Sequence, residues 1–239
     1  MSNNFFKFKN FTIFQDDEVL KVSTDSVLLA SFVDNNLKPN NILDIGAGTG
    51  LLSLAMASFF DNATIDAVEI DSHSYSFLIK NISLSKYSNR IKPYLQDIRH
   101  FKKLNYDLII TNPPFFSDMP LPHSSKKKLF KHLSTISIEE LSKIIVNKLN
   151  TNGKLYIILS VKSFEKFRTF ASAYKLYPSK IIEIKWTPKK NTERIIAEFT
   201  FDNSHSISKT NICIYDNNLN PTKEYIKLTS KLYLDSHFR

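Results

Sequence analysis

Asn41 to Gly50 reads Asn-Ile-Leu-Asp-Ile-Gly-Ala-Gly-Thr-Gly, an apolar strand that runs directly into a glycine-rich turn. The apolar run that begins at Leu51 is typical of a helix. Glycine has no side chain, so a ligand can approach the bare backbone of such a turn at the carboxyl end of the strand. The segment therefore predicts a ligand site at the edge of a sheet.

Strands and helices alternate at a regular spacing around this turn. We expect strands over residues 42–45, 64–69, 91–95, 107–111 and 154–159, and helices over 51–60, 72–84, 137–149 and 163–173. Two β-rich runs, 179–186 and 194–201, resemble an antiparallel C-terminal hairpin. Because alternating strands and helices imply right-handed crossovers, the pattern predicts a Rossmann-like α/β fold with a seven-stranded, mostly parallel sheet.

We expect residues 1–239 to form a single domain. Residues 39–203 would be its catalytic core, 1–38 an N-terminal extension, and 204–239 a further strand and a terminal helix over 221–232. In the extension, residues 26–32 read as a helix that Thr24 or Asp25 could cap. Asn152-Gly153 is expected to close the unit that the helix 137–149 belongs to.

The composition favours a soluble protein with a polyanionic partner. Lys and Arg number 32 against 23 Asp and Glu, a net charge of +9 with a pI near 9.4, although a compositional bias of the source would produce the same excess. The single cysteine, Cys213, has no intrachain partner, which fits a reducing compartment. Because the sequence shows neither a signal-peptide pattern nor an apolar run as long as a membrane span, we expect a cytoplasmic location.

The glycine spacing separates two kinds of nucleotide site. Gly46, Gly48 and Gly50 alternate with other residues, whereas the dinucleotide fingerprint places its third glycine one position later, at Leu51. The spacing therefore argues against NAD and favours a nucleoside cofactor without a pyrophosphate.

Acidic residues stand at the ends of the predicted strands. We assign Asp44 to the turn and to the charged amino-acid end of the cofactor, Glu69 to its ribose hydroxyls and Asp97 to its adenine amino group. A strand-end carboxylate can instead cap the next helix, and capping is the preferred interpretation of Asp71. Three glycines and three carboxylates at successive strand ends together predict one cofactor site.

The tetrapeptide Asn112-Pro113-Pro114-Phe115 follows the fourth predicted strand. The Asn112 side-chain carbonyl and the Pro113 backbone carbonyl can both accept from one planar NH2 group, while Phe115 stacks on the attached ring. In isolation, the same residues would also fit a proline-rich loop with an incidental aromatic side chain. At the end of a strand beyond the glycine turn, they predict a site that holds an exocyclic amine toward an electrophilic methyl group.

Together these motifs resemble the class I S-adenosylmethionine-dependent methyltransferases of the Asn-Pro-Pro-aromatic branch, which modify nitrogen. More closely, the chain is similar to the bacterial valine-tRNA adenine-N6 methyltransferases, which act on the adenosine 3′ of the anticodon. The segments that carry the resemblance are Phe11–Gln15, Leu20–Ala30, the glycine turn, Ala67–Asp71, Thr111–Phe116 and Thr210–Leu234.

The resemblance implies S-adenosylmethionine as the cofactor, tRNA as the partner and a class I methyltransferase sheet. It also implies that residues 1–38 pack over the cofactor, with Thr24 and Asp25 in contact with it, and we assign Asn112 to both the cofactor and the substrate. The family often has a glycine after that aspartate, where this chain has Ser26. The reaction needs no metal, and a metal-ligand spacing is missing from His100, His123, His132 and His237.

The expected reaction is methyl transfer to adenine N6 in tRNA, at the adenosine 3′ of the anticodon of tRNA(Val), by a monomer. Asn112, Pro113 and Phe115 would present the base. Phosphate attraction would come from the basic residues Lys126, Lys127, Lys128 and Lys131. Methylation of a protein glutamine or of guanine N2 would suit the same acceptors, and an RNA-binding module without catalysis is the alternative outside enzymes.

Overall fold

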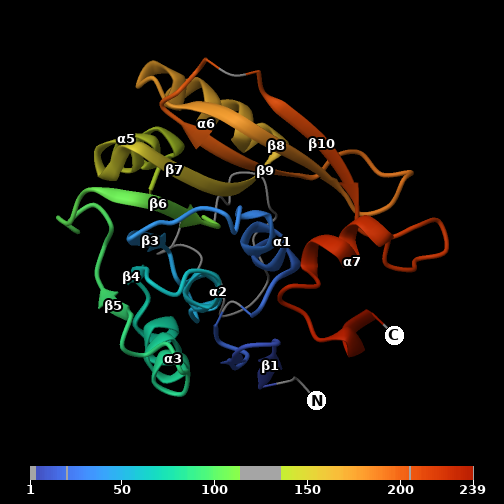
Figure 1. The fold of residues 1–239 in the computed structure, drawn as a ribbon, viewed down its shortest axis with the longest axis horizontal. Helices are drawn as coiled ribbons and strands as arrows, with labels where there is room; N and C mark the ends of the chain where they lie inside the picture. The colour runs from blue at the N-terminus through green and yellow to red at the C-terminus, as the bar shows by residue number, and fades with distance from the viewer. Residues whose placement is uncertain (1–3, 20, 114–135, 205, 239) are drawn as a thin grey trace.

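The computed structural model describes residues 4–19, 21–113, 136–204 and 206–238, and Figure 1 shows their arrangement. The strands of the main sheet are β3 (Asn41–Ile45), β4 (Thr64–Glu69), β5 (Ile91–Leu95), β6 (Tyr106–Thr111), β7 (Leu149–Ser160), β8 (Tyr177–Lys185), β9 (Arg194–Thr200) and β10 (Ser208–Cys213). Within the described residues, they pair in the order β10-β8-β9-β7-β6-β3-β4-β5. Neighbours are parallel except at β9, which is antiparallel to both β7 and β8.

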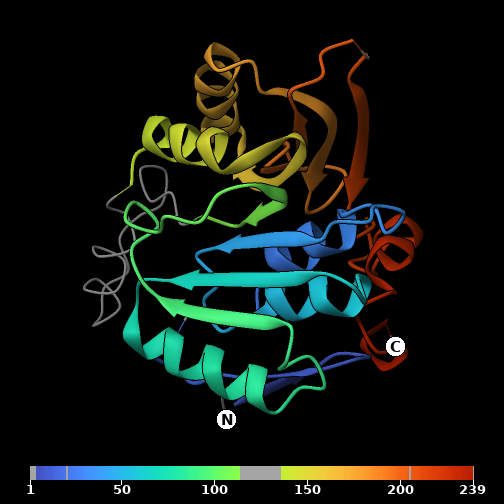
Figure 2. The same cartoon turned by 60° about the vertical axis from the view of Figure 1, so that its left-hand side comes forward.

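Helices cover both faces of this sheet. They are α1 (Thr24–Phe32), α2 (Leu51–Phe59), α3 (Ser72–Ser83), α5 (Ile138–Lys148), α6 (Val161–Ala173) and α7 (Lys223–Thr229). Figures 1 and 2 show α5 and α6 on one face and α1, α2 and α7 on the other. Successive strand residues alternate between two buried clusters, so that Ile42 and Ile110 face α1 while Leu43 and Ile109 face α5. The sheet is therefore the middle layer of three.

The two ends of the chain pack against each other. A small antiparallel hairpin of β1 (Phe5–Lys7) and β2 (Thr12–Phe14) leads into α1, and the 3-10 helix η2 (Asp235–Phe238) lies near the C-terminus. The rings of Phe8 and Tyr233 stack with centroids 5.9 Å apart, and Lys9 Nζ pairs with Asp235 at 3.1 Å. None of the helices in the described ranges is long and apolar enough to cross a membrane.

The predicted fold class is confirmed, including the antiparallel pairing of β8 with β9. Among the described residues the sheet has eight strands rather than seven, because the further strand expected in residues 204–239 is β10, which joins the sheet by pairing in parallel with β8. The register places Ile45 opposite Val68 of β4 and Thr111 of β6. The carboxyl ends of β3, β4 and β6, which carry the glycine turn and Asn112, therefore meet at one edge.

Local expectations were partly wrong. Ser23, not Thr24 or Asp25, caps α1, because its Oγ accepts from the Ser26 backbone N–H at 3.2 Å. The Asn152-Gly153 pair lies inside β7, since α5 passes directly into that strand. A Cβ at Gly153 would lie 2.8 Å from the Tyr106 carbonyl oxygen, so glycine permits a close strand approach there.

The expected cap of α3 is confirmed. Asp71 Oδ2 accepts a hydrogen bond from the Ser74 backbone N–H at 2.7 Å. The terminal helix α7 is shorter than predicted, and Thr222 caps it by accepting from the Tyr225 backbone N–H at 3.2 Å.

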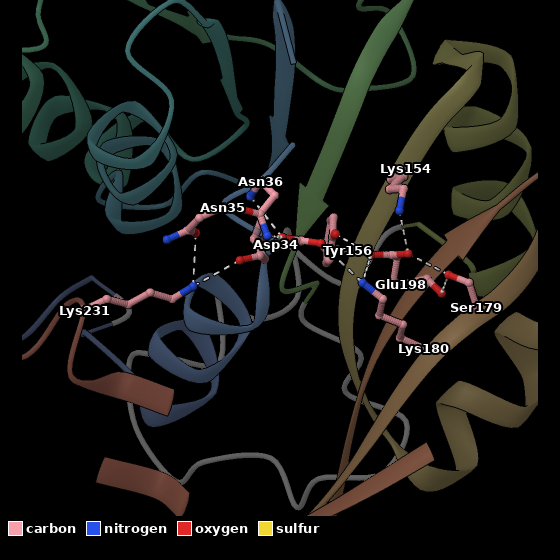
Figure 3. Close-up of polar contacts among 10 residues, drawn as sticks. Asp34, Asn35, Asn36, Lys154, Tyr156, Ser179, Lys180, Glu198 and Lys231 are labelled. Carbon is pink, nitrogen blue, oxygen red and sulfur yellow. Dashed lines mark hydrogen bonds and ion pairs between the residues drawn. The ribbon is translucent and has the colours of Figure 1, made fainter. Parts of the chain in front are cut away.

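A buried polar network joins β7, β8 and β9 to the segment after α1 (Figure 3). At its centre, Glu198 is 1% exposed and accepts from Lys154 Nζ at 2.9 Å, from Ser179 Oγ at 2.8 Å and from the Tyr156 hydroxyl. Burial opposes ionisation of Glu198, but hydrogen bonds from Tyr156, Lys154 and Ser179 outweigh it and hold the pKa of the carboxyl below its ordinary value. Lys180 bridges Glu198 to Asp34 at 3.5 and 3.6 Å. The network therefore fastens the end of α1 to the antiparallel part of the sheet.

Candidate active site

The glycine turn has a backbone that only glycine adopts readily. Gly46, Gly48 and Gly50 have φ of 71°, 56° and 94°, in the left-handed region. A Cβ at Gly46 or Gly48 would meet nothing within 4 Å, whereas one at Gly50 would lie 2.8 Å from the Leu78 side chain. The first two glycines therefore border open space and the third faces the core, which agrees with a turn built to admit a ligand.

Glu69, the last residue of β4, holds this turn in place. Its Oε2 accepts from the Gly48 backbone N–H at 2.7 Å, and its Oε1 accepts from Ile70 and Asp71 N–H at 2.9 and 2.8 Å. The residue is 3% exposed, and this burial raises the pKa of the carboxyl despite the three hydrogen bonds. The structure thus places Glu69 at the glycine turn, where its carboxylate binds three backbone N–H groups.

Asp44 lies beneath the turn with one oxygen unpaired. Its Oδ2 accepts from Ser53 Oγ at 2.6 Å, while its Oδ1 has no hydrogen-bond partner among the described residues. The side chain is fully buried, and this burial, with a smaller effect of the neighbouring Glu69, raises the pKa of Asp44 to about 7. An unpaired buried carboxylate oxygen is costly, and a cationic ligand group would offset that cost.

Asp97 follows β5 at the same edge of the sheet, since Leu95 pairs with Glu69 and the Gln96 N–H donates to the Glu69 carbonyl at 2.9 Å. Its carboxylate is engaged by Arg99, whose Nε lies 3.0 and 2.9 Å from the two oxygens. The hydrogen bond from Arg99 is the main reason that the pKa of Asp97 is below its ordinary value. The Asp97 carboxylate that was predicted to bind the cofactor is therefore already bound to Arg99, a residue that the sequence did not single out.

Asn112 stands directly after β6, beside the glycine turn. Thr111 anchors this position, because its Oγ1 donates to the Ile45 carbonyl oxygen at 2.8 Å. The Asn112 side chain is partly buried, and its Nδ2 donates to Ser26 Oγ in the first turn of α1 at 2.9 Å. Pro113 follows and is partly exposed. The described residues end there, so Phe115, Lys126, Lys127, Lys128 and Lys131 lie outside them.

The first turn of α1 lies between Asn112 and the hairpin of β8 and β9. Asp25 Oδ2 accepts from Arg194 Nε at 2.8 Å, and the side chains are 23% and 31% exposed. Thr24, the other predicted cofactor contact of this turn, is also partly buried. Sequence reasoning missed both the Asp25–Arg194 pair and the Ser26–Asn112 bond, because their members are 169 and 86 residues apart.

Two further residues support the site from below. Ser53 of α2 binds Asp44, and Asn81 of α3 donates from Nδ2 to the carbonyls of Phe14 at 2.9 Å and Thr49 at 2.8 Å. Asn81 is 1% exposed and joins the N-terminal hairpin to the glycine turn. Within the described ranges, the structure shows no group of three or more His, Cys, Asp or Glu side chains placed to hold a metal ion.

The sequence is similar to those of known proteins. The model of the methyltransferase small domain family matches residues 11–164. A relative in Flavobacterium psychrophilum, named tRNA1(Val) (adenine(37)-N6)-methyltransferase, is 37% identical over 232 residues, which are 96% of this chain and 99% of the relative.

Solved structures agree on the fold. A protein from Agrobacterium tumefaciens, described as a predicted O-methyltransferase, superposes with a TM-score of 0.63 over 87% of this chain and 96% of that chain, at 18% identity. The P. horikoshii TYW2 protein in complex with MeSAdo superposes with a TM-score of 0.58 over 82% of this chain and 69% of that chain, also at 18% identity.

Proposed function

Because the chain belongs to the methyltransferase small domain family, we propose that it transfers a methyl group from S-adenosylmethionine to N6 of an adenine in tRNA. The relative in Flavobacterium psychrophilum is named for this reaction at adenine 37 of tRNA1(Val), and we propose the adenosine 3′ of the anticodon as the target here. The observation that carries the proposal is the position of Asn112, held at the end of β6 beside the glycine turn. Within the described residues, the Asn112 side chain makes its hydrogen bond to Ser26 through its NH2 group, so its amide carbonyl would be able to bind the amine that receives the methyl.

The residues of the turn fit S-adenosylmethionine. The unpaired Oδ1 of Asp44 would accept from the ammonium of the amino-acid end, and the open positions at Gly46 and Gly48 leave room for the ligand. Glu69 would bind the ribose hydroxyls and Asp97 the adenine amino group, since carboxylate oxygens have several lone pairs to share. Thr24 and Asp25, in residues 1–38, would cover the cofactor from the side of α1. When bound, the cofactor supplies an electrophilic methyl group on a sulfonium.

The substrate amine would be held by two carbonyl oxygens. Asn112 Oδ1 and the Pro113 backbone carbonyl would each accept one N–H of the exocyclic amine. The lone pair of that nitrogen is delocalised into the adenine ring, so orienting the group toward the methyl lets the nitrogen become pyramidal where the bond forms. The N–methyl bond would form as the methyl–sulfur bond breaks, with the neutral thioether as the leaving group. The nitrogen is cationic at first and would lose one of its protons to solvent.

The base has to leave its stack to reach this site. Extrusion costs less from a single-stranded anticodon loop than from a duplex, and Phe115 would replace the lost stacking. Lys126, Lys127, Lys128 and Lys131 would bind phosphates, which predicts an affinity for tRNA that falls steeply with salt. We propose a cytoplasmic monomer that works without a metal.

The proposal is tested with the purified protein, labelled S-adenosylmethionine and total tRNA that lacks modifications. Nucleosides from the digested RNA are separated by liquid chromatography and identified by mass spectrometry. We expect the label in N6-methyladenosine. Label in N2-methylguanosine or in protein glutamine would move the proposal to those substrates, and failure to bind the cofactor in calorimetry would favour an RNA-binding module.

A further inference from the structure

We propose that Ser26 is a positioning residue that sets the orientation of the Asn112 amide. The inference rests on the proposed function and adds to it a residue on α1. An asparagine amide has an acceptor on one side and a donor on the other, and half a turn about its terminal torsion exchanges them. An amine substrate needs the acceptor, so the reaction requires one of these two orientations.

The contact with Ser26 selects that orientation. Asn112 Nδ2 donates to Ser26 Oγ at 2.9 Å, which places the donor side of the amide against α1. Oδ1 is then left as the acceptor that can meet a substrate N–H. The amide would lose this bond if it turned over while Ser26 Oγ stayed an acceptor.

Ser26 Oγ is itself oriented by the cap of α1. Ser23 accepts from the Ser26 backbone N–H at 3.2 Å, and its hydroxyl donates to Ser26 Oγ at 3.1 Å. The Ser26 oxygen therefore accepts two hydrogen bonds, one from the Ser23 hydroxyl and one from Asn112 Nδ2, which uses both of its lone pairs. The helix cap and the amide thus both donate to Ser26 Oγ, which keeps this oxygen the acceptor in its contact with Asn112.

The first turn of α1 is also fixed from its other side. Asp25 Oδ2 and Arg194 Nε are 2.8 Å apart, so this turn is tied to the start of β9 as well as to the end of β6. These contacts fix the position of Ser26, so the Asn112 amide is oriented by a residue of α1 as well as by its own strand β6. Glycine at this position would lack the hydroxyl, so the proposed positioning depends on the Ser26 side chain.

The experiment compares the wild type with Ser26→Ala, Ser26→Thr and the control Ser31→Ala. Ser31 lies in the same helix, and its buried Oγ has no hydrogen-bond partner in the described chain. We expect Ser26→Ala to lower kcat for adenine N6 methylation about 5-fold, the effect of one positioning hydrogen bond, with the Kd for S-adenosylhomocysteine within 2-fold of the wild type. Ser26→Thr keeps the hydroxyl and should restore kcat, and Ser31→Ala should match the wild type.

A double-mutant cycle separates positioning from folding. If Ser26 acts through Asn112, then Ser26→Ala added to Asn112→Ala lowers the residual rate no further. A wild-type kcat in Ser26→Ala would overturn the inference. So would a full additional loss in the Asn112→Ala background, or a loss of kcat matched by weaker cofactor binding and a lower Tm.

A spectroscopic measurement does not depend on turnover. In protein labelled with 15N-asparagine, the Asn112 side-chain NH2 signal is assigned by its absence in Asn112→Ala. We expect this signal to move in Ser26→Ala and to return toward its wild-type position in Ser26→Thr, and an unmoved signal would refute the contact. A wild type that shows the contact but does not methylate adenine N6 would contradict the proposed function and leave the contact standing.

Discussion

Lowering the pH should weaken cofactor binding through Asp44. In the free protein the pKa of Asp44 is about 7, chiefly because the carboxyl is buried. If its ionised form receives the ammonium of the cofactor, affinity follows the ionised fraction, which is about one half at pH 7, one eleventh at pH 6 and one hundredth at pH 5. The Kd should therefore rise about 5-fold from pH 7 to pH 6 and about 50-fold from pH 7 to pH 5.

Lowering the pH has the opposite effect on the stability of the free protein, because protonation of Asp44 favours folding while it disfavours cofactor binding. The unfolded chain has the ordinary aspartate pKa of 3.8, so folding of the free protein favours the neutral carboxyl. The stability that this contributes is fully present below pH 3.8 and is lost as the pH rises through about 7. A cofactor that binds the ionised form should thus stabilise the protein most at neutral pH, where the free protein has lost this contribution.

Isothermal titration calorimetry with S-adenosylhomocysteine at pH 5, 6 and 7 measures this directly. Titrations in two buffers with different ionisation enthalpies report the protons released, which should approach one per site at pH 5. The control Asp44→Asn keeps an acceptor for Ser53 but cannot ionise, so its weaker affinity should change less between pH 5 and 7 than that of the wild type; Glu69, whose pKa is also raised, would account for the change that remains. A wild-type Kd that is constant over this range would refute the assignment of Asp44 to the ammonium.

Three further substitutions test other parts of the site and the fold. Asn112→Ala should lower turnover about 100-fold or more while cofactor affinity stays within 2-fold, since the main contact expected of Asn112 is with the substrate and its assigned contact with the cofactor is the minor one. A larger loss of cofactor affinity in calorimetry would contradict this division between the two sites. Gly46→Ala should weaken cofactor binding at least about 10-fold, because its methyl group enters the open space of the turn. Gly50→Ala should mainly lower the free energy of unfolding, by about 1–2 kcal/mol, because its methyl group meets the Leu78 side chain. Equal effects of the two alanines on cofactor affinity would contradict this placement. Glu198→Ala should lower the free energy of unfolding in urea by about 2–3 kcal/mol, because Lys154 and Tyr156 lose their partner, while turnover per folded molecule is unchanged. A stability equal to that of the wild type would show that the network contributes nothing.

The strands and the glycine turn could be predicted because each is indicated by residues that are close together in the sequence. Alternating apolar runs located the strands to within a few residues, and the glycine spacing located a turn whose three glycines have positive φ. Parallel pairing then brings Asp44, Glu69 and Asn112 to one edge, because strand ends in such a sheet coincide. The family resemblance is confirmed by the match over residues 11–164 and by the relative at 37% identity.

The parts that were missed depend on side chains far apart in the chain. Asp25 was predicted as a cofactor contact, and nothing near it in the sequence indicates its pairing with Arg194. Ser26 stood out only as a departure from the family, and its bond to Asn112 requires α1 to lie over the end of β6. The cap of α1 was misassigned for a different reason. Serine, threonine and aspartate stand together at 23–25, and propensity alone does not choose among them.

The most direct measurement uses an unmodified tRNA(Val) transcript, the wild-type protein and S-adenosylmethionine. After the reaction, the RNA is cut into oligonucleotides and the methyl group is located by fragment mass spectrometry. We predict one methyl per molecule, on N6 of the adenosine 3′ of the anticodon, and almost none with Asn112→Ala. A methyl at another position, on guanine N2, or at the same level with Asn112→Ala would contradict the account.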